Sequence, residues 1–164
     1  MLKTLYALFL IIIFSASCES QSKPDNNAKT PKLSAKEASS RQVIKTDQAP
    51  NPVGPYNQAI KVANTLYLAG QIGLDPESGK MVNSDIEEEA RQVMENLKAV
   101  LAEADMDMSH VVKSTIYMTD LNNFTRVNEI YAGYFGEDAP ARVTVGVASL
   151  PKDAQLEISM IAVK

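Results

Sequence analysis

The chain has 164 residues, of which 45% are hydrophobic and 22% are charged. This fits one globular domain with a tail, and it excludes both a pair of large domains and a fully disordered chain. The net charge of -4 makes nucleic acid a poor partner. With one cysteine and one histidine there is no disulfide framework and too few ligands for a structural zinc site. We therefore expect no metal, and chemistry that rests on carboxylates, arginine and backbone groups.

The first residues have the layout of an export signal. Lys3 precedes an unbroken apolar run from Leu5 to Phe14, which gives way to the small residues at 15–17. A helix of that length extends about 15 Å, roughly half the hydrocarbon thickness of a bilayer. We therefore expect residues 1–17 to be a cleaved signal peptide. A helix buried in the fold is disfavoured, because the run has no polar face.

The single cysteine, Cys18, directly follows these small residues. The segment resembles the lipobox of bacterial lipoproteins, in which the cysteine is lipidated and becomes the new N-terminus; Ser15 departs from the usual aliphatic residue. Simple cleavage after Ser17, leaving a free cysteine, is the alternative. Residues 19–41 are too polar to order themselves, so residues 18–41 are expected to be a lipidated cysteine and a flexible tether. The expected location is the bacterial cell envelope, with a lipid anchor in the membrane.

Residues 42–164 are expected to form the domain. Three prolines make the segment around Gly54 a rigid loop, and later segments alternate between strand and helix patterns. The pattern predicts an α+β fold, a mixed β-sheet with two helices on one face. The predicted order is a short apolar start at 43–45, strands at 56–61 and 66–72 joined at Ala63-Asn64, a helix at 85–104, a strand at 111–118, a helix from Asn122 or Asn123 to Phe135 closed by Gly136, and strands at 142–148 and 155–163.

The first helix has apolar residues at spacings of three and four, which predict one buried stripe. Ser84 and Glu87 have the spacing of a capping box, and Glu87 and Arg91 that of a helical ion pair. We interpret the acidic run of residues 87–89 as a solvated helix start and not as a metal site, because no histidine or second carboxylate cluster accompanies it.

The last two strands are each expected to offer one charged side chain from a face that does not pack on the core. Alternation separates Arg142 and Thr144 from the valines of their strand, and Glu157 from the apolar residues of its strand. If the two strands are neighbours, Arg142 and Glu157 line one pocket, where the arginine could bind a carboxylate and the glutamate could orient or deprotonate water. The alternative is a cross-strand ion pair that only holds the register.

Several separate motifs resemble, in order and spacing, the RidA (YjgF) family of reactive intermediate deaminases, over nearly all of residues 44–164. They are Ala49-Pro50 through Gly54-Pro55-Tyr56, Ala69-Gly70-Gln71-Ile72, Thr119-Asp120-Leu121 with Phe124 and Val127-Asn128, Pro140-Ala141-Arg142, and Leu150-Pro151 through Glu157-Ile158.

The resemblance implies a chorismate-mutase-like fold, a homotrimer with sites between subunits, and cofactor-free hydrolysis of enamines or imines such as 2-aminoacrylate to 2-keto acids and ammonia. By position, Arg142 resembles the arginine that binds the substrate carboxylate and Glu157 the acid that positions water. The resemblance also implies cleft residues at Tyr56, Gly70 and Asn128, from the neighbouring subunit, and at Thr144, which stands where many members have a cysteine.

Other interpretations stay open at this point. Tyr56 could be a packing aromatic, and Asn128 could merely bond the helix backbone. The domain could also be a non-catalytic envelope module that binds small carboxylates or a protein in the same cleft, because 2-aminoacrylate arises mainly in the cytoplasm. A ribonuclease is disfavoured by the acidic charge and the lack of a basic stripe.

Overall fold

The structure is a computed structural model and describes residues 40–164. The predicted signal peptide, Cys18 and nearly all of the tether lie outside the described residues. None of the helices in the described part is long and apolar enough to cross a membrane. The main elements are β1 (Arg41–Ile44), β2 (Ala59–Val62), β3 (Thr65–Gln71), α2 (Ile86–Glu103), β4 (Val111–Met118), α3 (Phe124–Ala132), β5 (Ala141–Gly146) and β6 (Leu156–Val163).

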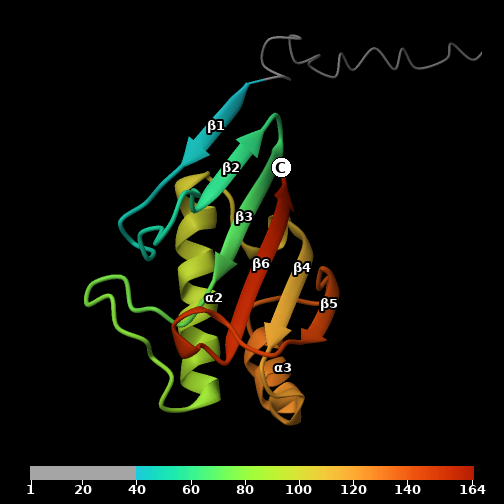
Figure 1. Cartoon of the computed structure of the whole chain (residues 1–164). Helices are drawn as coiled ribbons and strands as arrows, with labels where there is room; N and C mark the ends of the chain where they lie inside the picture. Colours follow the sequence, from blue (N-terminus) through green and yellow to red (C-terminus); the bar gives the residue numbers. More distant parts are fainter. Residues whose placement is uncertain (1–39) are drawn as a thin grey trace, which may run out of the picture. The chain divides into compact units, whose positions relative to one another are not determined.

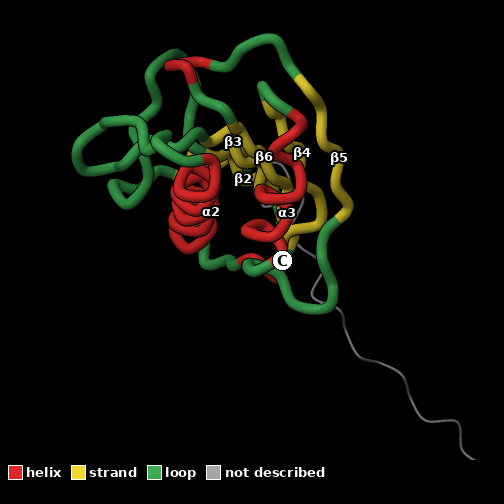
Figure 2. The backbone as a smooth tube through the Cα atoms, turned by 90° about the horizontal axis from the view of Figure 1, so that it is seen from below, coloured by secondary structure: helices red, strands yellow, loops and turns green. Residues whose placement is uncertain are grey.

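The strands form one six-stranded sheet in the order β1-β2-β3-β6-β4-β5 (Figure 1). All neighbours are antiparallel except β4 and β5, which are parallel. Figure 2 shows α2 and α3 side by side on one side of the sheet. The expected mixed sheet with two helices on one face is therefore confirmed, with β1 as an additional edge strand. The last strand, β6, runs in the middle of the sheet and not beside β5.

Period-two alternation fixes which side of the sheet is covered. Along β6 every second residue from Leu156 to Ala162 is buried, and the residues between them are partly exposed. The buried set packs on α2, whose stripe includes Val93, Leu97 and Leu101, all with 0% exposure. The hydrophobic core thus lies between the helices and one face of the sheet, and we call the other face the open face.

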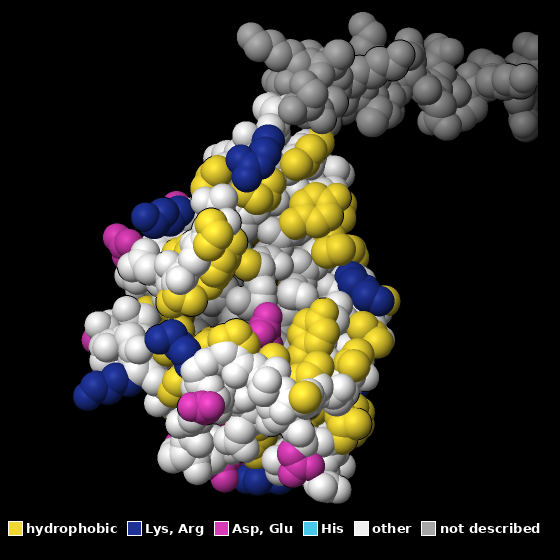
Figure 3. Space-filling model, in the orientation of Figure 1, with side chains coloured by type: hydrophobic (Ala, Val, Ile, Leu, Met, Phe, Trp, Pro, Cys, Tyr) yellow, Lys and Arg dark blue, Asp and Glu magenta, His cyan; other side chains and the backbone are white. Residues whose placement is uncertain are grey.

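The open face carries apolar side chains that the chain leaves exposed. Tyr67, Val143 and Val145 are exposed by 49%, 41% and 40%. Their partners across the sheet include Ile161 and Tyr117, which lie on the same face. In Figure 3 hydrophobic side chains gather over the strands, around an acidic side chain. A contiguous apolar surface of this kind is typical of a protein interface.

The start of α2 differs from the prediction. Asp85, not Ser84, is the N-cap, and its carboxylate accepts a hydrogen bond from the backbone N–H of Glu87 at 2.7 Å. The carboxylate accepts strongly and lies one residue nearer the first turn, so Ser84 donates instead to the Glu88 carboxylate. Glu87 pairs with Arg126 of α3 and not with Arg91. The acidic run is not fully solvated either, because Glu89 is completely buried.

The second helix is shorter than predicted. A 3-10 turn at Leu121–Asn123 precedes α3, which ends at Ala132 with Gly133 as its C-cap. Asp120 caps the 3-10 turn through the N–H of Asn122, so neither asparagine caps α3 with its side chain. Gly133 ends α3 three residues before the predicted Gly136, and Phe135, beyond the end of the helix, packs against the core.

The first predicted strand also begins late. β2 starts at Ala59 because the preceding segment is held as a loop by the buried Gln58 side chain. Its Nε2 donates to the carbonyl oxygens of Thr46, Ala49 and Pro50, and its Oε1 accepts from the N–H of Thr46. These bonds satisfy backbone groups of a segment whose prolines prevent it from pairing in a β-sheet.

Candidate functional site

Glu157 stands on the open face of β6, next to an irregularity in β3. The β3–β6 register shifts between Leu68 and Gln71, so that Ala69 and Gly70 together oppose a single residue of β6. The Oε1 atom of Glu157 occupies the space that a Cβ at position 70 would fill. The sequence therefore needs glycine at position 70 to let the carboxylate lie against the β3 backbone.

The Glu157 carboxylate is unusual in its surroundings. It is half-buried, and among residues 40–164 no group donates a hydrogen bond to it or pairs with it. Burial without a compensating charge raises the pKa of Glu157 above its ordinary value. A carboxylate with a raised pKa and free oxygens is suited to accept a proton from water near neutral pH.

Arg142 lies on the other face of the sheet, under α3. Its guanidinium carbon is 4.9 Å from the ring centroid of Tyr131 and 5.7 Å from that of Phe124. These contacts hold the planar group by cation–π attraction. Tyr131 is fixed in turn, because its hydroxyl donates to Ser114 Oγ at 2.9 Å. No carboxylate within residues 40–164 pairs with Arg142, so its five N–H donors remain available for a ligand.

Asn128 and Thr144 lie beside Arg142. All three line a small cavity between α3 and β5 that is too tight to hold a water molecule, and whose apolar wall includes Met118 and Phe124. The Asn128 side chain makes no hydrogen bond to the helix backbone within the described part of the chain. The resemblance implied that Asn128 joins the site with Tyr56 and Gly70 from the neighbouring subunit, but Asn128 lies beside Arg142 and Thr144 of its own chain. The backbone-bonding alternative for Asn128 is wrong.

A pocket shared by Arg142 and Glu157 within one chain required β5 and β6 to be neighbours, and they are not. β4 separates them, and the registers place the two charges on opposite faces. In the strand register Glu157 pairs with Tyr117, and Tyr117 pairs with Val145, on the open face. Arg142 pairs with the buried Ser114 on the helix face. Neither a pocket formed within one chain nor a cross-strand ion pair can join Arg142 to Glu157. One chain thus holds two half-sites: Gly70 with Glu157, and Arg142 with Asn128 and Thr144.

Tyr56 lies in the loop before β2 with 45% exposure, which excludes a packing role in the core. Its hydroxyl accepts a hydrogen bond from the N–H of Val53 at 3.3 Å. Two residues later, the carbonyl of Gln58 accepts from the N–H of Ala69. The loop that carries Tyr56 therefore leads directly to the strand position beside Gly70.

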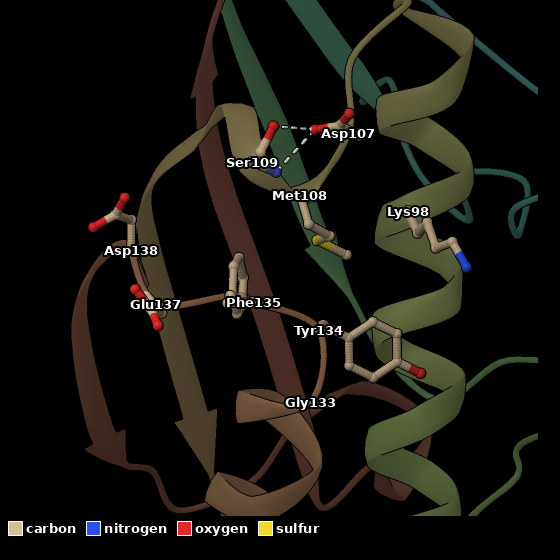
Figure 4. Close-up of a pocket in the computed structure, with 10 residues that line it drawn as sticks. Lys98, Asp107, Met108, Ser109, Gly133, Tyr134, Phe135, Glu137 and Asp138 are labelled. Atoms are coloured by element: carbon tan, nitrogen blue, oxygen red, sulfur yellow. Dashed lines mark hydrogen bonds between the residues drawn. The ribbon is translucent and has the colours of Figure 1, made fainter.

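A larger hollow lies elsewhere in the domain. It has a volume of about 730 Å³ and lies between the end of α2, the 3-10 turn at Met108–His110 and the segment after α3 (Figure 4). Asp107, on its rim, is already bonded to Ser109 and His110. Tyr134 donates to Glu95, and this bond together with burial raises the pKa of Tyr134 to about 12. Glu137 and Asp138, which also line the hollow, have no partner within residues 40–164, but both are exposed, unlike the half-buried Glu157.

Two features near the half-sites were not anticipated. Phe124 and Tyr131 are seven residues apart and so share one face of α3, which is the signal that could have identified them as the aromatic support of Arg142. Glu89, interpreted as solvated, is buried and bonded to the start of β6. No three His, Cys, Asp or Glu side chains in residues 40–164 are placed to hold a metal ion.

The mixed sheet with two helices on one face defines an α+β protein of the YjgF type. The chain belongs to the family described as Endoribonuclease L-PSP, whose model matches residues 46–164, so the expected RidA (YjgF) membership is confirmed. A RutC family protein of Pyrococcus abyssi is 52% identical over 124 residues, 76% of this chain and 98% of that protein. The human 2-iminobutanoate/2-iminopropanoate deaminase is 45% identical over 124 residues, 76% of this chain and 90% of that protein.

Solved structures agree with this membership. E. coli TdcF with bound serine has 38% identity and a TM-score of 0.73, covering 75% of this chain and 98% of that one. The YjgF gene product of E. coli has 39% identity and a TM-score of 0.72, with the same two coverages. The resemblance therefore extends over the domain and leaves out the N-terminal segment.

Proposed function

We propose that this protein hydrolyses reactive enamines and imines of the 2-aminoacrylate type to 2-keto acids and ammonia. The observation that carries the proposal is the half-buried Glu157 carboxylate, which lies against Gly70 with no partner in the described part of the chain. Supporting it, relatives 45% and 47% identical, from human and mouse, are named 2-iminobutanoate/2-iminopropanoate deaminase. Serine bound to TdcF indicates that a small amino acid fits a protein of this fold.

In the proposed mechanism Arg142 binds the substrate carboxylate through paired N–H donors. The iminium carbon is electrophilic without further activation. Glu157 accepts a proton from water as the water oxygen bonds to that carbon and the C=N π electrons move to nitrogen. Transfer of a proton to nitrogen and loss of the hydroxyl proton then release ammonia and form the ketone. Charge-assisted hydrogen bonds from Arg142 contribute about 1.5 to 3 kcal/mol to substrate binding, and a general base accelerates a reaction by about 10²- to 10⁴-fold. Together these two contributions are sufficient for hydrolysis of an electrophilic iminium.

Because the half-sites lie on opposite faces of the sheet, we further propose that the complete site forms between subunits of a homotrimer. The exposed apolar side chains of the open face support this assembly. β5 is an edge strand, so a neighbouring subunit can approach the Arg142 half-site without disrupting the sheet. Gly70 and Glu157 would come from one subunit, with Tyr56 near them, and Arg142, Asn128 and Thr144 from the next.

The activity is tested by generating imines with an amino-acid oxidase and timing their disappearance. We expect the purified protein to accelerate the decay, and an Arg142→Ala variant to have lost most of that acceleration. No acceleration by the wild type, or equal acceleration by the variant, contradicts the proposal. If 2-ketobutyrate raises the melting temperature without any imine hydrolysis, the protein is instead a non-catalytic carboxylate-binding module.

The family description contains the word endoribonuclease, but the charge of this chain does not favour that activity. The net charge is -4, and neutralisation of phosphates by basic side chains dominates nucleic-acid affinity. A salt-sensitive association with single-stranded RNA would favour the ribonuclease over the deaminase.

Location is a separate part of the proposal and rests on sequence alone. We propose that residues 1–17 direct export, and that a lipid on Cys18 holds the domain on the envelope membrane through the tether. Treating expressing cells with a signal-peptidase II inhibitor should make the precursor accumulate, and Cys18→Ala should remove the protein from the membrane fraction. Unchanged processing in both experiments contradicts lipidation.

A further inference from the structure

A buried carboxylate outside both half-sites is bonded to the strand that carries Glu157. Glu89 lies in the first turn of α2 with 0% exposure. Its Oε1 accepts hydrogen bonds from the backbone N–H groups of Gln155 at 2.9 Å and Leu156 at 3.2 Å. Its Oε2 accepts from Nε2 of Gln155 at 3.3 Å.

These bonds replace a missing part of the sheet. The β3–β6 pairing ends at Gln71 and Ile158, so the N–H groups of Gln155 and Leu156 have no carbonyl partner on β3. A buried N–H without a partner is costly, and the Glu89 carboxylate supplies the acceptor. On the opposite side of β6, the carbonyl of Gln155 accepts from the N–H of Thr119. The backbone immediately before Glu157 is therefore held from both sides.

The chain after β3 leaves room for this side chain. A Cβ at position 73 would lie 2.6 Å from Cγ of Glu89, so Gly73 permits the close approach. Glu89 thus fits between the segment that follows Gly70 and the segment that precedes Glu157. Burial raises the pKa of Glu89, whereas the three N–H donors oppose that rise, and no charged group contributes.

We propose that Glu89 is a positioning residue for the site: by holding the backbone of Gln155 and Leu156 it places the Glu157 carboxylate against Gly70. The inference rests on the proposed function in taking Glu157 as the general base. A misplacement of about 1 Å in a reacting group can reduce a rate by about 10²-fold. The geometry makes Glu89 the group that prevents such a displacement at the start of β6.

The test compares two substitutions. Glu89→Leu removes both acceptors and should lower kcat for imine hydrolysis by about 10- to 100-fold. Glu89→Gln retains one oxygen for the two backbone N–H groups and should stay within about threefold of wild type. Glu88→Leu is the matched control, because Glu88 is in the same helical turn but is bonded only to the Ser84 hydroxyl. All rates are compared at temperatures where melting curves show each variant fully folded.

Ligand binding separates positioning from general damage. Arg142 is on β5, away from the Glu89 contacts, so the Kd for 2-ketobutyrate should change less than about threefold in Glu89→Leu while kcat falls. A kcat equal to that of wild type overturns the inference. A parallel loss of kcat and 2-ketobutyrate affinity also overturns it, since that result describes a purely structural residue.

A second readout does not depend on activity. With ¹³C-labelled glutamate, the Glu157 carboxyl signal can be assigned by its absence in Glu157→Gln. Its titration midpoint should move down toward 4.5 in Glu89→Leu, as the loosened strand admits water, and should stay unchanged in Glu88→Leu. An unchanged titration midpoint of Glu157 in Glu89→Leu overturns the inference. If the wild type hydrolyses no imine, that result counts only against the proposed function, and the titration still tests the role of Glu89.

Discussion

Arg142 and Glu157 lie on opposite faces of one sheet, with β4 between their strands. Each charge is uncompensated within residues 40–164: the guanidinium makes cation–π contacts with two rings but no ion pair, and the carboxylate lies against Gly70 without a partner. A fold that gained only stability from these side chains would be expected to pair them or expose them fully. Their arrangement is what a site completed by a second copy of the chain requires.

The first prediction concerns the space beside Gly70. A Cβ at this position overlaps the Glu157 carboxylate, so Gly70→Ala should displace the carboxylate and reduce kcat by at least about tenfold. Gly136→Ala is the matched control, because a Cβ there meets nothing within 4 Å and its backbone needs no positive φ. Steady-state kinetics of both variants check the prediction, and equal activity in the two would show that the close approach is irrelevant.

The second prediction concerns Glu157 as a base. Glu157→Gln preserves the size of the side chain but cannot accept the proton from water, so kcat should fall by about 10²- to 10⁴-fold. The Kd for 2-ketobutyrate should change little, because Arg142 provides the main contact to its carboxylate. Single-turnover rates with oxidase-generated imine measure the first quantity and calorimetry the second. A variant with wild-type kcat would remove Glu157 from the mechanism.

The third prediction follows from the raised pKa of Glu157. The folded protein retains this proton at pH values where the unfolded chain, with a pKa near 4.5, has lost it. The contribution of Glu157 to the free energy of unfolding therefore decreases as the pH rises from about 4.5 through the folded pKa. The Glu157→Gln variant does not undergo this pH-dependent loss of stability. Its free energy of unfolding should therefore match that of wild type near pH 4 and exceed it above pH 7. Urea unfolding of both proteins across this range checks the sign, and a pH-independent difference would contradict it.

The fourth prediction concerns the shape of the Arg142 cation. Arg142→Lys retains the charge but loses the paired donors and the planar contact with Tyr131 and Phe124, so the Kd for 2-ketobutyrate should rise by about 10- to 100-fold. Arg126→Lys is the control: that arginine is exposed and pairs with Asp85 and Glu87, away from the cavity. If both variants bind alike, the carboxylate is held elsewhere.

Periodicity predicted the elements well, because each face of the sheet and of α2 has a regular burial pattern. Strand β4 was predicted with its observed bounds, and alternation separated the polar from the apolar positions of β5 and β6 correctly. The expected face was right for Glu157 on β6 but wrong for Arg142 on β5, which lies on the helix face while Val143 and Val145 are exposed. Strand order is a different kind of information. Alternation reports which residues of one strand share a face, but it does not relate the faces of strands that do not pair. The pairing of β6 with β3 and β4 therefore escaped prediction.

Burial at the helix start was missed for a related reason. Glu87, Glu88 and Glu89 look equivalent in sequence, and all three favour the positive end of the helix dipole. Only the end of the β3–β6 pairing and the small Gly73 make room for one of them in the interior. A tertiary gap in a ladder has no local sequence pattern, so a buried acceptor like Glu89 is found only from the structure.

The fifth prediction tests whether the site is shared between subunits. Arg142→Ala and Glu157→Gln chains should each form inactive homotrimers, because every site in them lacks one of the two groups. When the two chains are unfolded together and refolded at equal concentration, a shared site is intact where a Glu157→Gln chain supplies Arg142 and an Arg142→Ala neighbour supplies Glu157. Random assembly gives this arrangement at about one quarter of the sites in a cyclic oligomer, so about one quarter of wild-type activity should return.

Mixing without unfolding is the control for that recovery, because activity that returns only after unfolding and refolding together comes from the reassembly of mixed oligomers. A second control refolds the Arg142→Ala chain with a chain that carries both substitutions, a mixture in which no site has both groups and no activity should return. If the first mixture stays inactive while wild-type chains recover under the same conditions, Arg142 and Glu157 do not act at one site. In that case the two side chains, which lie on opposite faces of the sheet, have unrelated roles.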